Sequence, residues 1–148
     1  MLVGCGSQAP IDPITFDPCA SISVASAGAS SDQLASIDAA FAMWRDVGLP
    51  AFGRGATPDI AIVFHDAADS IYGFYDDTTA TIYVNTRLVD PAQRAITIAH
   101  ELGHSLGLVH IAPATRASVM NPGNVTLTPN AGDRATLATL WGSCSGAP

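Results

Sequence analysis

The chain has 148 residues, of which 48% are hydrophobic, and its six basic and thirteen acidic side chains give a net charge of −7. This length is enough for one domain with its own core. The acidic charge argues against nucleic acid as a partner, because phosphate binding requires clustered cations. It also argues against electrostatic attachment to an anionic membrane, and no apolar run is long enough to cross a bilayer. We therefore expect a compact acidic domain that is a monomer.

Residues 1–18 are rich in Pro, Gly, Ser and Asp, a composition that predicts an N-terminal tether ahead of a domain at 19–148. Leu2–Cys5 (LVGC) is similar to a bacterial lipobox, in which signal cleavage leaves an acylated cysteine. No basic region or apolar core precedes this sequence, so the tether either follows a lipoprotein signal or the match is chance. Cys5 is therefore a lipidation site or a bystander thiol. A lipid on Cys5 would be the protein's only means of membrane attachment.

The first predicted elements are a strand and a helix. Ala20–Val24 alternates small polar and apolar residues, which predicts a strand. The helix begins at Ser30 or Ser31, with Gln33 completing a capping box with Ser30, and ends at Gly48. Its apolar residues recur at helical spacing and predict a face packed on the core: Leu34, Ile37, Phe41 and Trp44.

Three more strands are predicted in the middle of the chain. Asp59–Phe64 is nearly all apolar, as is typical of a strand buried on both faces. Ile71–Tyr75 and Thr81–Val84 are strands separated by a polar turn at Asp76–Thr79.

Two more helices follow. The first has Asp90 as its N-cap, Pro91 at its first position and Gln93 in a second capping box, and it runs to about Leu106 before Gly107. The last helix is predicted from Thr128–Pro129 to Gly142, with three side chains facing inward: Leu137, Leu140 and Trp141.

The second predicted helix contains the pattern H-E-x-x-H-x-x-G-x-x-H. His100 and His104 are four residues apart, so their imidazoles project from one helix face, as two zinc ligands require. Gly107 can take the positive φ that turns the chain back and returns His110 as the third ligand. Three neutral imidazoles leave one coordination position for water, which is typical of a catalytic zinc. Glu101 lies beside the first ligand, where it can hold that water without binding the metal.

This pattern predicts a zinc-dependent endopeptidase that hydrolyses peptide bonds of protein or peptide substrates. A zinc-bound water would attack the scissile carbonyl, with Glu101 as the general base. The alternative is a non-catalytic zinc-binding or adhesion module on the same scaffold. Glu101 favours the enzyme, because a binding module gains nothing from a base beside an open metal position.

Together with Ser118–Pro122 (SVMNP), this motif resembles that of the metzincin zinc endopeptidases, in which a methionine in a tight turn lies beneath the metal. Met120 matches that methionine. Within the clan the chain is most similar to the matrixins, the matrix-metalloprotease type, in Ala40–Val47 (AFAMWRDV), in the strand beginning at Asp59, and in the ending Leu140–Gly142. The resemblance covers about residues 20–142.

The resemblance implies an α+β, metzincin-like zincin fold. Its parts are a twisted, mostly parallel five-stranded sheet with an antiparallel edge strand, an active-site helix, and a small C-terminal subdomain with one helix. It also implies one catalytic zinc ion and an extended peptide substrate held in a shallow cleft against an edge strand. Ile71–Tyr75 is either that edge or a plain buried or hairpin strand.

The sequence departs from the matrixin pattern near the metal. Ile111 stands where matrixins usually have Ser or Thr. Asn121 follows the methionine, so the tyrosine ligand of several metzincins is not expected. The wall of the primary specificity pocket falls near Pro122–Asn124, without the matrixin aromatic residue, so cleavage preference cannot be carried over.

Other matrixin features are weak here. His65, followed by Asp66, is the only trace of the second, structural zinc, and we interpret it as a loop histidine. Asp76 and Asp77 could contact calcium, but adjacent acids in a turn are more often simply solvated. Cys5 is not flanked by the Arg and Asp of the matrixin cysteine switch.

Cys19 and Cys144 lie near opposite ends of the chain. A disulfide between them would close almost the whole domain, which corresponds to roughly 4–5 kcal/mol in the chain-entropy model; the alternative is two free buried thiols. A disulfide is typical of exported proteins. We therefore expect a secreted protein or a bacterial cell-envelope lipoprotein.

Overall fold

The computed structural model describes residues 12–144, which leaves Cys5 outside the described part. Their core is a five-stranded sheet with strand order β2–β1–β3–β5–β4. β1 pairs in parallel with β2 and β3, β3 pairs in parallel with β5, and β4 is the antiparallel edge strand beside β5. The strands are β1 (Ile22–Ala25), β2 (Phe52–Arg54), β3 (Ile60–His65), β4 (Gly73–Asp76) and β5 (Thr81–Asn85).

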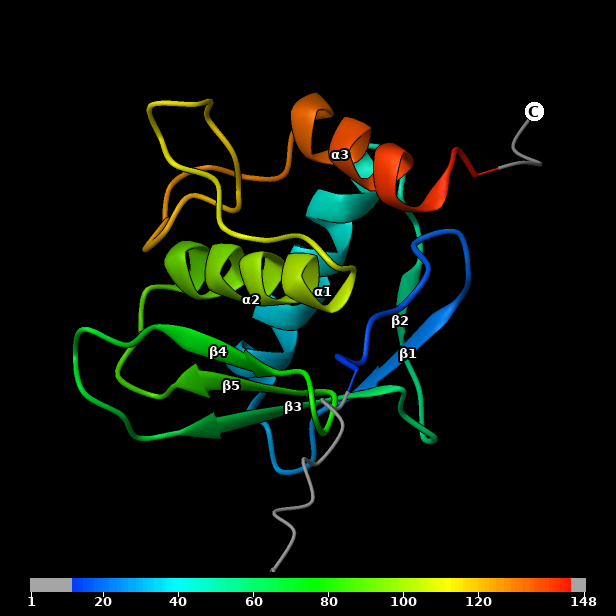
Figure 1. The fold of residues 1–148 in the computed structure, drawn as a ribbon. Coiled ribbons are helices and arrows are strands. Elements are labelled where there is room, and N and C mark those ends of the chain that lie inside the picture. The colour runs from blue at the N-terminus through cyan, green and yellow to red at the C-terminus, as the bar shows by residue number, and fades with distance from the viewer. Residues whose placement is uncertain (1–11, 145–148) are drawn as a thin grey trace, which may run out of the picture.

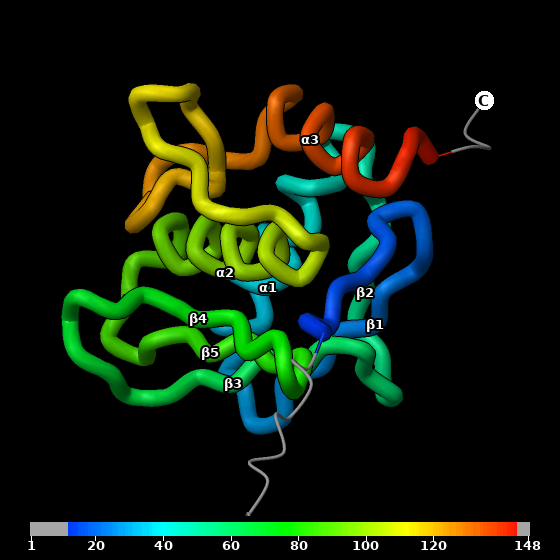
Figure 2. Tube along the Cα trace, in the orientation of Figure 1, coloured from blue at the N-terminus to red at the C-terminus, as the bar shows by residue number. Residues whose placement is uncertain are grey.

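Three helices complete the described part of the chain: α1 (Ser31–Asp46), α2 (Pro91–Ser105) and α3 (Ala131–Trp141). α2 lies between the sheet and α3, and the segment that connects α2 to α3 passes over the far side of α2 (Figures 1 and 2). This arrangement confirms the predicted α+β class and the mostly parallel sheet with an antiparallel edge. No helix within residues 12–144 has the length and apolar character needed to cross a membrane.

The contact between α1 and α2 is built by the predicted apolar stripe. Ser30 caps α1 and forms the predicted capping box with Gln33. Trp44 is fully buried, and its indole N–H donates to the carbonyl of Ala99 at 3.1 Å. A buried tryptophan needs a partner for its N–H, so this bond fixes how α2 lies on α1. Ile37 and Phe41 are buried on the same face.

Several predictions about the elements need correction. β3 is not buried on both faces, because Val63 is 41% exposed. β2 was not predicted, since three residues carry too little pattern to identify a strand. Asp90 caps α2 by accepting from the Gln93 N–H, which is one half of the predicted capping box.

The last helix also differs from its prediction. It begins at Ala131 rather than at Thr128–Pro129, because Asn130 is the N-cap and forms a capping box with Asp133. Leu140 is 54% exposed, so it does not face inward. Trp141 is partly exposed and donates its indole N–H to the carbonyl of Leu106 at 2.8 Å.

Residues Asp12–Pro18, the described part of the predicted tether, lie against the domain, and we call this segment the N-terminal strap. The Ile14 N–H donates to the carbonyl of Asp77, and the Phe16 N–H donates to the carbonyl of Ser105, each at 2.8 Å. Phe16 is partly buried against the hydrophobic core. The strap therefore crosses from the end of β4 to the end of α2.

Cys19 and Cys144 form a disulfide with a sequence separation of 125 residues and a Cα–Cα distance of 5.1 Å. It joins the chain that follows the strap to the chain that follows α3. Most of the domain lies inside this loop, so the crosslink restricts the unfolded chain strongly.

We expect the double variant Cys19→Ser/Cys144→Ser to fold with a free energy of unfolding lower by roughly 2–5 kcal/mol, because the unfolded chain regains its entropy. Denaturant titration measures this difference. Cys5→Ser is the matched control, since it makes the same substitution at a cysteine that takes no part in the disulfide. A double variant as stable as the wild type would contradict the prediction.

Candidate metal centre

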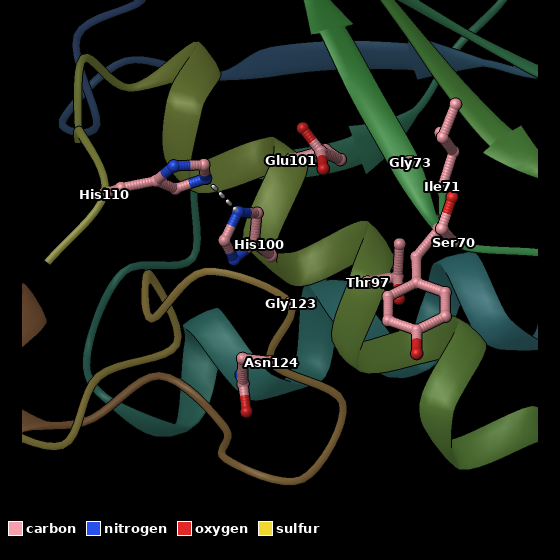
Figure 3. Close-up of a pocket in the computed structure, with 10 residues that line it drawn as sticks. Ser70, Ile71, Gly73, Thr97, His100, Glu101, His110, Gly123 and Asn124 are labelled. Carbon is pink, nitrogen blue, oxygen red and sulfur yellow. Dashed lines mark hydrogen bonds between the residues drawn. The ribbon is translucent and has the colours of Figure 1, made fainter. Parts of the chain in front are cut away.

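The three histidines of the sequence motif converge beside α2. His100 and His104 project from one face of the helix, and Gly107, with a φ of 93°, turns the chain so that His110 returns to them. The Nε2 atom of His110 lies 3.1 Å from that of His100 and 3.3 Å from that of His104. Figure 3 shows the rings of His100 and His110 turned toward each other.

These distances suit one zinc ion. Tetrahedral coordination with Zn–N bonds of about 2.0–2.1 Å separates ligand nitrogens by roughly 3.3 Å. The Nδ1 atom of His100 lies 2.6 Å from the Val119 carbonyl, and that of His104 lies 2.8 Å from the Leu108 carbonyl. Each carbonyl requires an Nδ1–H donor, which leaves the Nε2 lone pair free for a metal.

Burial keeps two of these rings neutral. The pKa of His100 is lowered to about 4, mainly by burial and to a lesser degree by the neighbouring His104 and His110, while the bond to the Val119 carbonyl opposes the shift. Burial also lowers the pKa of His104. Zinc binds the neutral imidazole, so neither ring must lose a proton at neutral pH before it can coordinate a metal.

Glu101 is 5% exposed and lies at the inner wall of the site. Burial raises the pKa of its carboxyl group to about 8, and the backbone N–H of Tyr75 partly offsets the increase. A carboxyl group with a pKa near neutrality can both take up and release a proton under physiological conditions. In the metal-free protein this carboxyl group is therefore suited to proton transfer.

Met120 is fully buried, in a turn whose methionine side chain packs on α2 at Gly103. A Cβ atom on Gly103 would come within 2.5 Å of the Met120 sulfur. Only glycine permits this approach, since real Cβ atoms essentially never come under 3.0 Å. The sequence pattern did not reveal this role of Gly103, because the residue is an ordinary interior helix position.

Asp133 anchors the same turn from α3. Its carboxylate is fully buried and accepts hydrogen bonds from the Ser118 hydroxyl, from the Val119 N–H at 3.2 Å and from Arg116 at 2.9 Å. Val119 in turn supplies the carbonyl that orients His100. Asp133 is thus a positioning residue, which sequence reasoning missed because it placed the start of α3 too early.

Asn121 explains how the turn holds the chain beyond the third histidine. Its amide donates to the carbonyls of Ile111 at 2.8 Å and Arg116 at 3.1 Å. The Ile111 N–H also donates to the Met120 carbonyl at 3.0 Å. The two departures from the matrixin pattern, Ile111 and Asn121, therefore contact each other and fix the approach of His110.

Two hollows border Glu101. One, of about 270 Å³, lies between the chain before β4 and the chain at Gly123, and Tyr72, Thr97 and Asn124 contribute to its lining. Asn124 falls in the predicted wall at Pro122–Asn124, and Figure 3 shows it across the hollow from Thr97. The Thr97 hydroxyl is buried without a hydrogen-bond partner in the described structure. Sequence patterns offered no signal for Thr97, which reads as a core helix residue.

The other residues weighed for metals, His65, Asp66 and Asp76, make other contacts, whereas Asp77 lines the second hollow beside His104 and His110. The His65 ring packs edge-on against Tyr83, with ring centroids 5.2 Å apart. Asp66 pairs with Arg87, and Asp76 accepts hydrogen bonds from Thr78. Within residues 12–144, His100, His104 and His110 form the only cluster of three or more potential metal-binding side chains.

We expect Gly103→Ala to lower the free energy of unfolding by roughly 1–3 kcal/mol, because the added methyl group displaces Met120. Thermal unfolding measures the loss. Gly53→Ala is the control, since a Cβ there would meet nothing within 4 Å. In the Met120→Ala variant, Gly103→Ala should lower the free energy of unfolding by less than it does in the wild type. An equal decrease in both proteins would contradict the contact between Gly103 and Met120.

The buried carboxyl group predicts a pH-dependent stability in the metal-free protein. The pKa of Glu101 is about 8 in the folded state against 4.5 for the ordinary group. Between these values the folded state binds the extra proton, so its stability decreases as pH rises. Glu101→Gln removes this dependence, and its stability relative to wild type should therefore increase from about pH 5 to about pH 8. The histidine contributions are common to both proteins and cancel in the comparison. Denaturant titrations at both pH values measure the difference, and a constant difference would be the contrary result.

Comparison with known proteins gives one family match and several structural ones. Residues 57–118 match the family model of the IrrE N-terminal-like domain, Peptidase_M78. This match covers less than half of the chain but includes all three histidines and Glu101. No curated protein matches the sequence.

Among solved structures, one crystal structure of myroilysin is similar with a TM-score of 0.60 and 15% identity over 88% of each chain. A second myroilysin structure has a TM-score of 0.51 and 19% identity over 66% of this chain; the present chain covers 52% of its length. High choriolytic enzyme 1, a hatching enzyme zinc-protease from Oryzias latipes (Medaka fish), has a TM-score of 0.54 and 14% identity over 86% of this chain and 92% of its own. The chain therefore has the fold of the metzincin-like zinc peptidases.

Proposed function

We propose that this protein is a zinc-dependent endopeptidase that hydrolyses peptide bonds of protein or peptide substrates. One observation carries the proposal: three imidazole Nε2 atoms converge at zinc-ligand distances beside a buried carboxyl group. The match to a peptidase family model over the same residues supports it.

His100, His104 and His110 would hold the metal through their Nε2 atoms. A bound zinc ion would supply a water molecule of lowered pKa and would polarise the scissile carbonyl. Gly107 supports the site by turning the chain, and Met120 supports it by filling the space below α2.

Glu101 would act as the proton carrier. As general base it takes the proton of the attacking water, and it then donates this proton to the amine that leaves. The buried position keeps bulk water from competing for the proton, and a nearby cation would favour the ionised carboxylate that accepts it. The same residue is therefore suited to both halves of the transfer.

An extended substrate would pair with the edge of β4. Among residues 12–144, this strand pairs with another strand only on its β5 side, and Gly73 lines both hollows beside Glu101. Backbone pairing with a sheet edge gives affinity that is independent of sequence. The hollow between Thr97 and Asn124 would receive one substrate side chain.

The disulfide supports the further proposal that the protein acts outside the reducing cytoplasm. Secretion and a lipid-anchored envelope location both fit this feature. Lipidation of Cys5 and the closer assignment to the matrixins stay predictions.

Activity is tested by incubating the zinc-loaded protein with an unfolded protein substrate. We expect cleavage that a chelator abolishes. Glu101→Ala should retain zinc but lose activity by about a hundredfold to ten-thousandfold, the usual contribution of a general base. Zinc content is measured by metal analysis, and His65→Ala is the control, since His65 lies away from the centre. If wild type and Glu101→Ala both bind zinc and neither cleaves, the protein is a binding module instead.

A further inference from the structure

The edge of β4 offers few free backbone groups. The Asn85 N–H donates to the Tyr72 carbonyl at 2.9 Å, so the backbone N–H and C=O groups of Tyr72 face β5. Backbone groups alternate between the two sides of a strand. The backbone groups of Phe74 therefore also face β5, whereas those of Gly73, Tyr75 and Asp77 face away from it, and the Tyr75 N–H lies near the Glu101 carboxyl group.

The last of these positions is already occupied by the N-terminal strap. The Ile14 N–H donates to the Asp77 carbonyl at 2.8 Å, and the Tyr75 hydroxyl donates to the Ile14 carbonyl at 2.6 Å. The Phe16 N–H is bonded to the Ser105 carbonyl, and the disulfide of Cys19 follows directly. The strap is thus fixed to the domain at the strand, at the helix and at its own end.

The strap also walls the second hollow at the metal centre. This hollow, of about 380 Å³, is lined by Pro13 and Thr15 on the strap and by His104 and His110 on the opposite side. Two exposed apolar side chains border it, Phe74 and Val109, which are 57% and 72% exposed. The groove along β4 therefore ends at the strap on the Asp77 side of the histidines.

The register gives the length of chain that this part of the groove can hold. Antiparallel pairing is slightly more stable than parallel pairing, so a substrate lying on β4 runs from the Asp77 end toward Gly73. Gly73 is adjacent to Glu101, because a Cβ there would lie 3.2 Å from the Glu101 Cγ. A substrate residue that lies opposite Gly73 can be preceded by about three substrate residues, which lie opposite Phe74, Tyr75 and Asp76. A fourth preceding residue would meet Ile14.

We propose that the N-terminal strap sets substrate length, so that the protein selects peptides with about three residues before the scissile bond. This inference rests on the proposed peptidase function. The residue next to the strap meets the apolar surface of Phe74 and Val109, which favours an apolar side chain there. Substrates are then protein or peptide chains whose cleavable bond lies close to an N-terminus.

The test compares two peptides with one common cleavage sequence, preceded by about three or by about six residues. A longer peptide either displaces the strap, breaking its two bonds at β4, or gives up its own pairing with β4 before it reaches the strap; losing two hydrogen bonds corresponds to roughly ten- to a hundredfold weaker binding. Binding is measured by fluorescence anisotropy with zinc-loaded Glu101→Ala, and cleavage is measured as kcat/KM with wild type. We expect the shorter peptide to be preferred in both measurements.

Two variants release the strap. Ile14→Pro removes the N–H that bonds to Asp77, and Tyr75→Phe removes the hydroxyl that bonds to Ile14. Each change is made in the wild-type protein, for cleavage, and in Glu101→Ala, for binding. Either change should bring the two peptides to within about threefold of each other by improving the longer one. Ile14→Val keeps the N–H, and Tyr83→Phe removes a hydroxyl on β5, so these controls should keep the preference. Circular dichroism confirms that each variant is folded.

The outcomes separate this inference from the proposed function. If binding depends on peptide length but the wild type cleaves neither peptide, the peptidase proposal is rejected and the role of the strap in setting length is retained. If the wild type cleaves both peptides equally well, the peptidase proposal is retained and the role of the strap is overturned. A preference that persists in both folded strap variants also overturns it, and so does the absence of peptide binding.

Discussion

The metal centre depends on how closely α2 approaches the turn that contains Met120. Gly103 leaves no side chain between them, so the methionine sulfur lies directly against the helix backbone. At this separation the Val119 carbonyl reaches the His100 ring. Asp133 holds the turn from the other side by accepting bonds from its backbone and side chains. A buried carboxylate with several donors is costly to move, because each donor would lose its partner. One contact between helix and turn therefore sets the orientation of the first metal ligand.

The same site combines groups that burial leaves uncharged. Burial lowers the pKa of His100 and raises that of Glu101, so both groups resist ionisation in a low-dielectric environment. Neutral imidazoles and a carboxyl group that ionises easily beside a cation are suited to a divalent metal. The protein thus holds its ligands ready without the repulsion that three charged rings would create.

The groove beside this centre is shaped by parts of the chain that are distant in sequence. β4 supplies a free edge, the segment after α2 supplies the opposite side, and the strap supplies the end. The Cys19–Cys144 disulfide fixes the chain at the end of the strap to the chain after α3. In the proposed peptidase, α2 would carry the catalytic chemistry and the chain around it would select the substrate.

The sequence by itself determined the features that depend on local periodicity. The spacing of His100, His104 and His110 is a property of one helix and one glycine turn, and the Ser30 cap and the Trp44 stripe also follow from neighbours along the chain. Only the tertiary structure decided the roles of Gly103, Asp133 and the strap. Their partners lie many residues away, and hydrogen bonds between distant segments leave no pattern in the sequence. The start of α3 could not be placed from the sequence for the same reason, because Thr128–Pro129 also looks like a helix start. The helix begins later, after the Asn130 cap, where the buried Asp133 can bond to the turn that contains Met120.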